Sequence, residues 1–551
     1  ALGLIGSYAT PALIPSADPS AWSFFPYLLV ILIASFATLR GKDWWWLGYA
    51  AIAGSAGWTL LWIKGGVFEP ADLWPVGLFA HVLGVVAFYG LKGRGILDDE
   101  SGDLRDARTI TQPLAIGLFG LAAGAVLLLL LVDHTGHDLW AIVLLAVAVA
   151  GLVVVAWMKS GVSLLAPLGG LLLFVTLMAW NEAAFHDWAM DERGLWSSVP
   201  GPAAGQFLRW MLGAATALTI IGIAGTLTRP RPLNWGLLAG AAGVLFIVGS
   251  WGRVDLLLSE NSWAGVAAII AALLVAGVWL SRGAPMGDRQ NAAAGLLAAG
   301  SAGLMVFALD RVFDHVWLTI AIAVLATLYA LSTRVLTAWL LGPVTAALAT
   351  LATIRLFVSR ELWSDDRTMA WGQHWVIYGY GVPAILFLMA SRWLKAAGHL
   401  RSAVALEGIS LGLVISLVSL ELRVLIGGGF LYDEPQFLEV AAHILTWLGA
   451  AYGLMYRQRL YSSFISLWGA RVLIAVSVAA IILLSLIALN PIVTEDIVPG
   501  NIIFNALLLA YLAPVILIGL IAMRLDVIGW QSLKPAAGGL ALVLAFVYLT
   551  L

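Results

Sequence analysis

Apolar stretches of roughly twenty residues recur along the whole sequence and are separated by short polar connections. Segments of this length match the thickness of a bilayer, and lipid cannot hydrogen-bond a backbone, so each is expected to be a helix. The strict alternation of a transmembrane barrel is absent. The pattern predicts an all-α, polytopic transmembrane helix bundle of about nineteen spans. The spans are expected to begin near Ala1, Trp22, Trp44, Asp72, Gln112, Leu139, Ser163, Ala204, Leu233, Trp263, Asn291, Val316, Val335, Trp371, Ser402, Gln436, Ser463, Gly500 and Leu533.

Composition supports the membrane class and excludes several chemistries. Hydrophobic residues make up 62% of the chain and charged residues 11%, against roughly 45–50% and 25% in soluble domains. The sequence has no cysteine, which excludes disulfides, thiolate catalysis and Cys-ligated metals. It has no motif for nucleotide hydrolysis, serine hydrolysis or zinc proteolysis. The sequence therefore indicates no catalytic residue, no metal and no cofactor.

Charge alternates between successive connections. Lys and Arg collect in every second connection, from Arg40 and Lys42 to Arg524 and Lys534, and the intervening connections carry Asp and Glu. The positive-inside rule predicts that the basic connections are cytoplasmic and the acidic ones outside. Residues 92–111 have mixed charge and are expected to form a cytoplasmic linker. Scattered basic residues suit anionic lipid headgroups, so membrane lipids, and not nucleic acid, are the expected partners.

Short motifs recur along the chain, which predicts one transmembrane domain over residues 1–551 built from repeated helical hairpins. Two approximate repeats cover residues 291–395 and 402–525. The final residues, 545–551, resemble residues 415–420, which precede Glu421. We therefore expect the chain to be a fragment of a longer protein.

One hairpin type carries a tyrosine and a proline after its outer loop. The stretch that runs from residue 358 to Tyr380 and Pro383 resembles the stretch from residue 489 to Tyr511 and Pro514. The opening of the chain, from Tyr8 to Tyr27, has the same outline.

Three of these stretches also carry a family resemblance. Residues 3–11, the turn at 420–428, and the hairpin from Asn490-Pro491 through Asn505 to Pro514 resemble the bacterial multi-pass membrane proteins catalogued as domain of unknown function 2339. The resemblance covers most of the chain. It implies a large helical protein of the bacterial inner membrane, and it brings no established catalytic residues.

Charged residues near or within spans are the first candidate sites. Arg471 lies inside an apolar span, where an unpaired guanidinium costs at least about 2.5–3.5 kcal/mol. Either its side chain reaches the cytoplasmic headgroups or it forms an ion pair that lines a cavity.

Glu421 and Arg423 are two residues apart and diverge on a helix, so each is expected to contact a different neighbour. Asp310 and Arg311 are a similar acidic and basic pair one repeat earlier, and their contact partners have to be identified in the same way. These residues either form salt bridges between repeats or bind an anion.

Histidines concentrate in the outer connections and supply further candidates. Acid-to-histidine spacings of four occur at Asp133 to His137, Glu182 to His186 and Glu439 to His443. On a helix this spacing places both side chains on one face, although acids and histidines in the same zones also meet by chance. Residues 181–209 form the longest outer loop, where Glu182 and His186 lie among tryptophans. This loop is either an interfacial segment anchored by tryptophan or a site for a lipid-linked glycan.

Three classes of function remain open. The favoured hypothesis is transport or flipping of an envelope lipid, a glycan precursor or another amphiphile, with Arg471, Glu421, Arg423, Asp310, Arg311, His443, Glu182 and His186 as candidate substrate-binding residues. A structural or assembly protein of the envelope is the second class. A membrane-embedded glycosyl- or acyl-type transferase with an outer-face site is the third.

Overall fold

The computed structural model describes residues 2–13, 20–91, 111–190, 196–282, 288–336, 338–358, 374–426, 436–491 and 505–550. Within these ranges the chain forms nineteen α-helices and one pair of short strands. Fifteen helical segments are long and apolar enough to cross a membrane. The expected all-α polytopic architecture is confirmed, and the number of helices matches the predicted number of spans.

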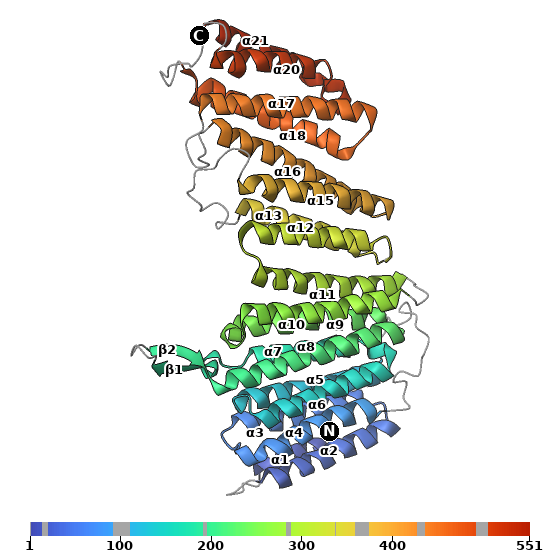
Figure 1. The fold of residues 1–551 in the computed structure, drawn as a ribbon. Coiled ribbons are helices and arrows are strands. Elements are labelled where there is room, and N and C mark those ends of the chain that lie inside the picture. Colours follow the sequence, from blue (N-terminus) through green and yellow to red (C-terminus); the bar gives the residue numbers. More distant parts are fainter. Residues whose placement is uncertain are drawn as a thin grey trace. The chain divides into compact units, whose positions relative to one another are not determined.

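The chain divides into two compact units, residues 1–308 and 309–551. In the first unit, helices that follow one another in sequence pack side by side (Figure 1). Its helices are α1 (Leu2–Leu13), α2 (Ala21–Gly41), α3 (Trp45–Lys64), α4 (Leu73–Tyr89), α5 (Gln112–His134), α6 (Leu139–Met158), α7 (Leu165–Met178), α8 (Pro202–Thr228), α9 (Pro232–Val254), α10 (Glu260–Ser281) and α11 (Asp288–Val312), whose last turn enters the second unit.

The second unit repeats this arrangement of neighbouring helices. Its helices are α12 (His315–Ser332), α13 (Leu341–Val358), α15 (Trp375–Ala396), α16 (Leu400–Ile426), α17 (Phe437–Leu460), α18 (Phe464–Ala480), α20 (Ala513–Ala522) and α21 (Lys534–Thr550). A π-helical segment, η5 (Ile481–Ala488), continues α18, and another, η6 (Leu508–Leu512), precedes α20. Two 3-10 turns, η7 (Leu525–Ile528) and η8 (Gln531–Leu533), connect α20 to α21.

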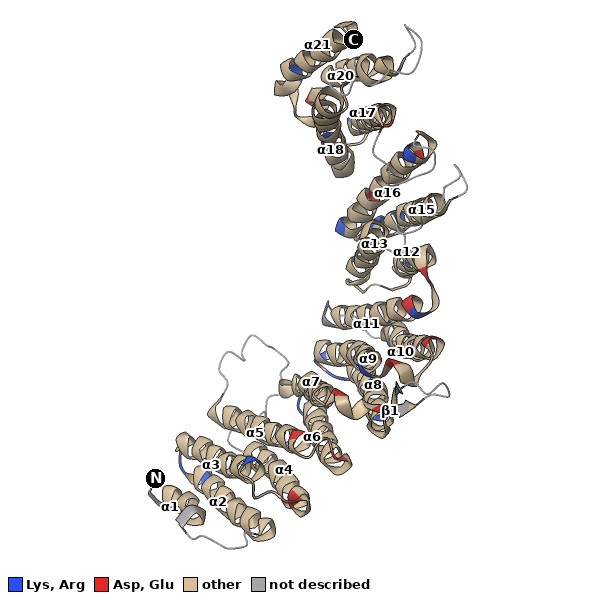
Figure 2. Cartoon of the chain, turned by 90° about the vertical axis from the view of Figure 1, so that its left-hand side faces the viewer, with Lys and Arg blue, Asp and Glu red and all other residues tan. Residues whose placement is uncertain are grey.

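Charged residues lie mainly near helix ends, and most residues along the described helices are uncharged (Figure 2). This distribution fits helices whose middles lie in lipid, where charge is costly. The assignment of the basic ends to the cytoplasm remains a prediction. The predicted linker at 92–111 lies, apart from Thr111, outside the described residues.

Three tyrosines support the repeated hairpins. The hydroxyl of Tyr27 donates to the carbonyl of Ser7 at 2.7 Å, that of Tyr511 to Ser485 at 2.8 Å, and that of Tyr380 to Leu356 at 3.4 Å. In each case the acceptor lies 20 to 26 residues earlier, on the helical segment that precedes it among the described residues. The hairpins that resemble one another in sequence therefore share one tyrosine contact between helices.

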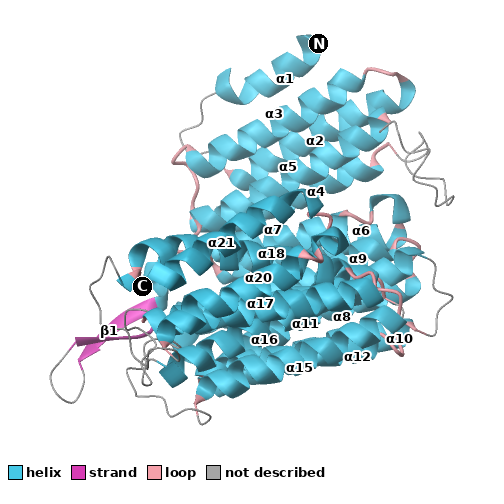
Figure 3. Cartoon of the chain, turned by 90° about the horizontal axis from the view of Figure 1, so that it is seen from above, coloured by secondary structure: helices cyan, strands magenta, loops and turns pink. Residues whose placement is uncertain are grey.

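Residues 181–201 contain the described strands. A 3-10 turn, η3 (Glu182–Phe185), leads into β1 (His186–Met190), which pairs antiparallel with β2 (Trp196–Pro200) (Figure 3). Helix α8 then begins at Pro202, so the connection ends earlier than the predicted loop over 181–209. Proline favours the first turn of a helix because its fixed φ suits the helix and the amide it lacks would have no partner there.

Small residues allow close helix packing in the first unit. A side chain at Gly240 of α9 would lie 2.7 Å from the carbonyl of Leu296 on α11. A side chain at Gly120 of α5 would overlap Ala87 of α4. Close backbone approach replaces the hydrophobic driving force that helices lack inside lipid.

We expect Gly120→Val to destabilise the first unit, because the added side chain forces α4 and α5 apart. Overpacking of this kind costs about 1–3 kcal/mol or more. Thermal unfolding in detergent measures the loss. Gly151→Val on α6 is the matched control, since Gly151 has open space around it. Equal melting temperatures for the two variants would contradict the packing argument.

Candidate functional site

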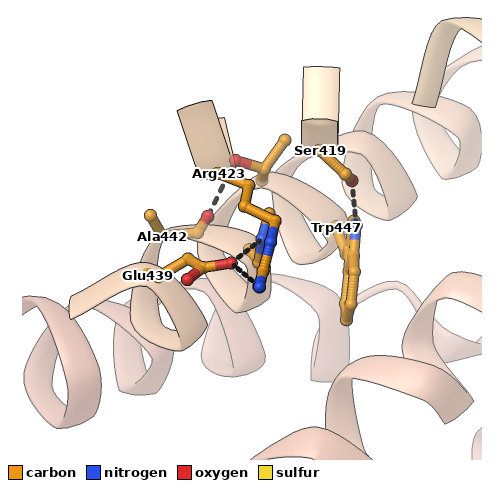
Figure 4. A network of polar contacts seen from close by, with 7 residues as sticks. Ser419, Arg423, Glu439, Ala442 and Trp447 are labelled. Atoms are coloured by element: carbon orange, nitrogen blue, oxygen red, sulfur yellow. Dashed lines mark hydrogen bonds and ion pairs between the residues drawn. The ribbon is translucent and has the colours of Figure 1, made fainter. Parts of the chain in front are cut away.

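Two rows of polar side chains face each other across α16 and α17. On α17, Glu439, His443 and Trp447 recur every fourth residue, and on α16 Ser419 and Arg423 do the same. Arg423 Nη1 donates to Glu439 Oε1 at 2.8 Å, and His443 Nε2 lies 3.4 Å from the same oxygen. Figure 4 shows Arg423 directed at Glu439 and the Trp447 indole directed at Ser419.

Glu439 is the most enclosed member of this cluster. It is only 2% exposed, and its carboxylate accepts from two side chains that carry or can carry positive charge. A buried carboxylate requires such partners because desolvation penalises an isolated charge. Glu439 and His443 lie on one face of α17, as their spacing of four residues predicts. Trp447 completes the row by stacking on the His443 ring, with centroids 5.5 Å apart, and donating to Ser419 Oγ at 3.0 Å.

Glu421 faces the opposite neighbour of α16. Its Oε1 lies 3.1 Å from Nε2 of His374, the buried residue that precedes α15. The expectation that Glu421 and Arg423 contact different neighbours is therefore confirmed. Helix α16 is linked to α15 through Glu421 and to α17 through Arg423. We call Glu421, His374, Arg423, Glu439 and His443 the polar network.

A groove of about 430 Å³ lies beside the polar network. Ser419 and Trp447 belong both to the polar rows and to the groove wall. The wall is mostly apolar, and it is formed by Phe357, Tyr380, Ile415, Ser416, Ser419, Leu420, Trp447, Leu473 and Val476. We call it the α16 groove. An apolar groove beside convergent polar groups is the usual form of a small-molecule site.

Arg471 binds a backbone carbonyl in another part of the second unit. Its Nε and Nη2 donate to the carbonyl of Ile528 at 3.1 and 2.7 Å, and its guanidinium lies over the rings of Trp468 and Trp530. Ile528 ends η7, where a helical carbonyl lacks a partner within the helix. The structure thus gives Arg471 a partner that the sequence interpretation did not include.

The remaining predicted residues form separate contacts. Arg311 contacts Asp310, its neighbour in the chain. Glu182, whose side chain is 61% exposed, lies 3.9 Å from Arg253 at the end of α9. His186 begins β1, so Glu182 and His186 do not share the face of a continuous helix. Among the residues that the structure describes, no three His, Asp or Glu side chains gather as a metal would require.

His137 is a buried residue whose environment the sequence did not reveal. It lies in the turn between α5 and α6, its ring stacks on Trp180 at 4.8 Å, and its Nε2 lies 3.0 Å from the carbonyl of Thr176. Burial lowers the pKa of His137, although the Thr176 carbonyl and Asp133 act in the opposite direction. The nearby Arg253 adds to the lowering.

We expect Glu439→Gln to destabilise the second unit, because it removes the buried carboxylate that forms an ion pair with Arg423. Breaking a buried ion pair costs about 3–5 kcal/mol. The matched control is Asp133→Asn, which breaks the exposed 3.3 Å pair with Lys64 and is expected to cost less than about 1 kcal/mol. Chemical denaturation in detergent compares the two. Similar losses would mean that Glu439 does not act as a buried counterion.

His137 is expected to make the first unit less stable in acid. Its folded-state pKa lies below the unfolded value of about 6.5, so the unfolded chain binds the proton more readily. The stabilising contribution is present above the unfolded pKa and is lost as the pH falls through the folded one. The melting temperature of the native protein should therefore fall more between about pH 7.5 and about pH 5 than that of His137→Gln. Parallel pH profiles for the two proteins would refute this role.

Comparison with known proteins gives one family. A family model described as "Predicted membrane protein (DUF2339)" matches residues 1–159 and residues 107–551. The two matches overlap and together span the chain. No curated protein and no solved structure matches it. The chain belongs to the DUF2339 family of predicted membrane proteins.

Proposed function

We propose that this membrane protein binds and transports an amphiphile, either an envelope lipid or a lipid-linked precursor. In this proposal the apolar tail lies in the α16 groove and the polar head lies against the polar network. We also propose that the protein resides in the bacterial inner membrane with its acidic connections outside, which would place the polar network near the outer leaflet.

One observation carries the proposal: a single helix supplies both surfaces. Ile415 and Leu420 of α16 line the groove, and the same helix continues into Glu421 and Arg423. Ser419, at the groove wall, is one turn from Arg423, which corresponds to roughly 6 Å along the helix axis. A molecule whose tail occupies the groove would therefore have its head near the end of α16 that carries Arg423.

The polar network suits a head group that both accepts and donates hydrogen bonds. Arg423 and His443 supply donors, and Glu421 and Glu439 supply acceptors. A phosphate would bind the guanidinium, and sugar hydroxyls would bind the carboxylates. The aromatic face of Trp447 at the groove wall adds a surface on which a sugar ring or an acyl chain packs.

A structural or assembly role in the envelope is the second candidate. The pairing of Glu439 with Arg423 and His443 favours it, because such contacts also stabilise helix ends without any ligand. The transferase alternative rests on Glu182 and His186, which do not share the face of a continuous helix. Occupation of the α16 groove separates transport from the structural role.

The first experiment is native mass spectrometry of the detergent-purified protein, with identification of the molecules that co-purify. Val476→Trp on α18 fills the α16 groove from a position that is 43% exposed, so it disturbs the fold little. We expect it to lower the occupancy of a stoichiometric amphiphile at least about tenfold, a change that corresponds to about 1.4 kcal/mol.

Val472→Trp is the matched control, because Val472 is exposed on the same helix one turn earlier and does not line the groove. It should retain the amphiphile. Equal occupancy in the two variants, or no stoichiometric amphiphile in the native protein, would reject the proposal and favour the structural role.

A further inference from the structure

We propose that a second groove in residues 309–551 binds an acyl chain of an anionic phospholipid from the leaflet on the basic side. This inference goes beyond the proposed function, because it concerns a different groove and does not require transport. The groove has a volume of about 620 Å³ and lies between α17, α18, α20 and α21. We call it the α21 groove.

The walls of the α21 groove are apolar. They are formed by Leu448, Ile474, Ala475, Val478, Ala479, Ile482, Ile518, Ile521, Leu525, Trp530, Leu533, Ala536, Ala537 and Leu540. Its volume falls in the range of about 300–1,000 Å³ that is typical of ligand sites. The four helices are membrane spans or shorter apolar helices, so hydrocarbon is the medium available to fill it.

Cations gather where the groove meets the connection between α20 and α21. Leu525, Trp530 and Leu533 of this connection line the groove. Arg524 precedes Leu525, and Lys534 follows Leu533. The Arg471 guanidinium lies 5.8 Å from the centroid of the Trp530 ring. At one end of an otherwise apolar groove, the wall residues Leu525 and Leu533 are thus adjacent in sequence to Arg524 and Lys534, and Arg471 lies over the wall residue Trp530.

Arg524 has capacity to bind an anion. Its guanidinium lies over the rings of Tyr452 and Tyr456, at 4.9 and 5.6 Å, and its Nη1 is buried with no hydrogen-bond partner among the described residues. Tyr452 is one turn along α17 from the groove residue Leu448. The Arg524 guanidinium therefore lies against α17, one to two turns from the groove residue Leu448.

The balance of charge at this end selects an anionic head. Asp526 is an exposed acid in the same connection, against the three cations. Arg457, near the end of α17, is already paired with Glu407 of α16. A phospholipid satisfies both halves of the site, because its acyl chain fills the groove and its phosphate accepts from Arg524 and Lys534. Free phosphate would leave the groove unfilled.

The test uses the full chain in nanodiscs that contain equal amounts of phosphatidylglycerol and phosphatidylcholine, followed by native mass spectrometry of the released protein. The native protein should retain phosphatidylglycerol at least about tenfold over phosphatidylcholine. Ala479→Trp fills the α21 groove and should lose the retained lipid. The double variant Arg524→Gln with Lys534→Gln should keep a lipid but lose the preference.

Two controls separate this site from the α16 groove. Val472 lines neither groove, so Val472→Trp should behave as the native protein. Val476→Trp should retain phosphatidylglycerol even where it abolishes binding in the α16 groove. If Ala479→Trp does not accumulate, Ala536→Trp fills the same groove from α21.

Three results would overturn the inference. The first is equal lipid retention by the native protein and the groove-filling variant. The second is an unchanged phosphatidylglycerol preference after both cations are removed. The third is a change in subunit number, instead of lipid number, when the groove is filled, because the groove would then be covered by protein.

Discussion

The architecture depends on one constraint: a backbone in hydrocarbon must satisfy its hydrogen bonds within its own segment. This constraint makes the apolar segments helical and sends charged side chains to the helix ends. Polar side chains that are buried between helices also need partners, because an unpaired buried polar group loses its hydration free energy. Glu439, Arg471 and His137 each meet that cost with specific partners, namely two side chains, a carbonyl that ends a 3-10 turn, and a carbonyl together with a tryptophan ring.

Polar contacts at the end of α16 illustrate how periodicity becomes geometry. Residues four apart lie on one helix face, so Ser419 and Arg423 form a row that meets Glu439, His443 and Trp447 on α17. Glu421, two residues from Arg423, faces α15 instead. One turn of α16 therefore contacts both neighbouring helices through charge. The same turn adjoins an apolar groove, and this proximity gives the site its amphipathic character.

The sequence predicted the helices well because hydrophobic length is a local property. The divergence of Glu421 and Arg423, and the shared face of Glu439 and His443, also follow from local periodicity. Partners on other helices were not predictable in this way. Nothing near Arg471 in sequence indicates the carbonyl of Ile528, and nothing near His137 indicates Thr176, because both contacts depend on how helices pack. The grooves were equally hidden, since apolar lining residues look like any lipid-facing residues.

Helix α18 separates two apolar grooves in the second unit. Leu473 and Val476 line the α16 groove, and Ile474, Ala475, Val478 and Ala479 line the α21 groove. A single helix therefore forms a wall of each. Its small and β-branched residues leave space on both sides without interrupting the backbone hydrogen bonds of the helix. The groove beside the polar network carries acids and bases together, whereas the groove beside Arg524 and Lys534 is bordered mainly by cations. Because the two charge environments differ, the two proposed sites are expected to select different head groups even though both grooves have apolar walls.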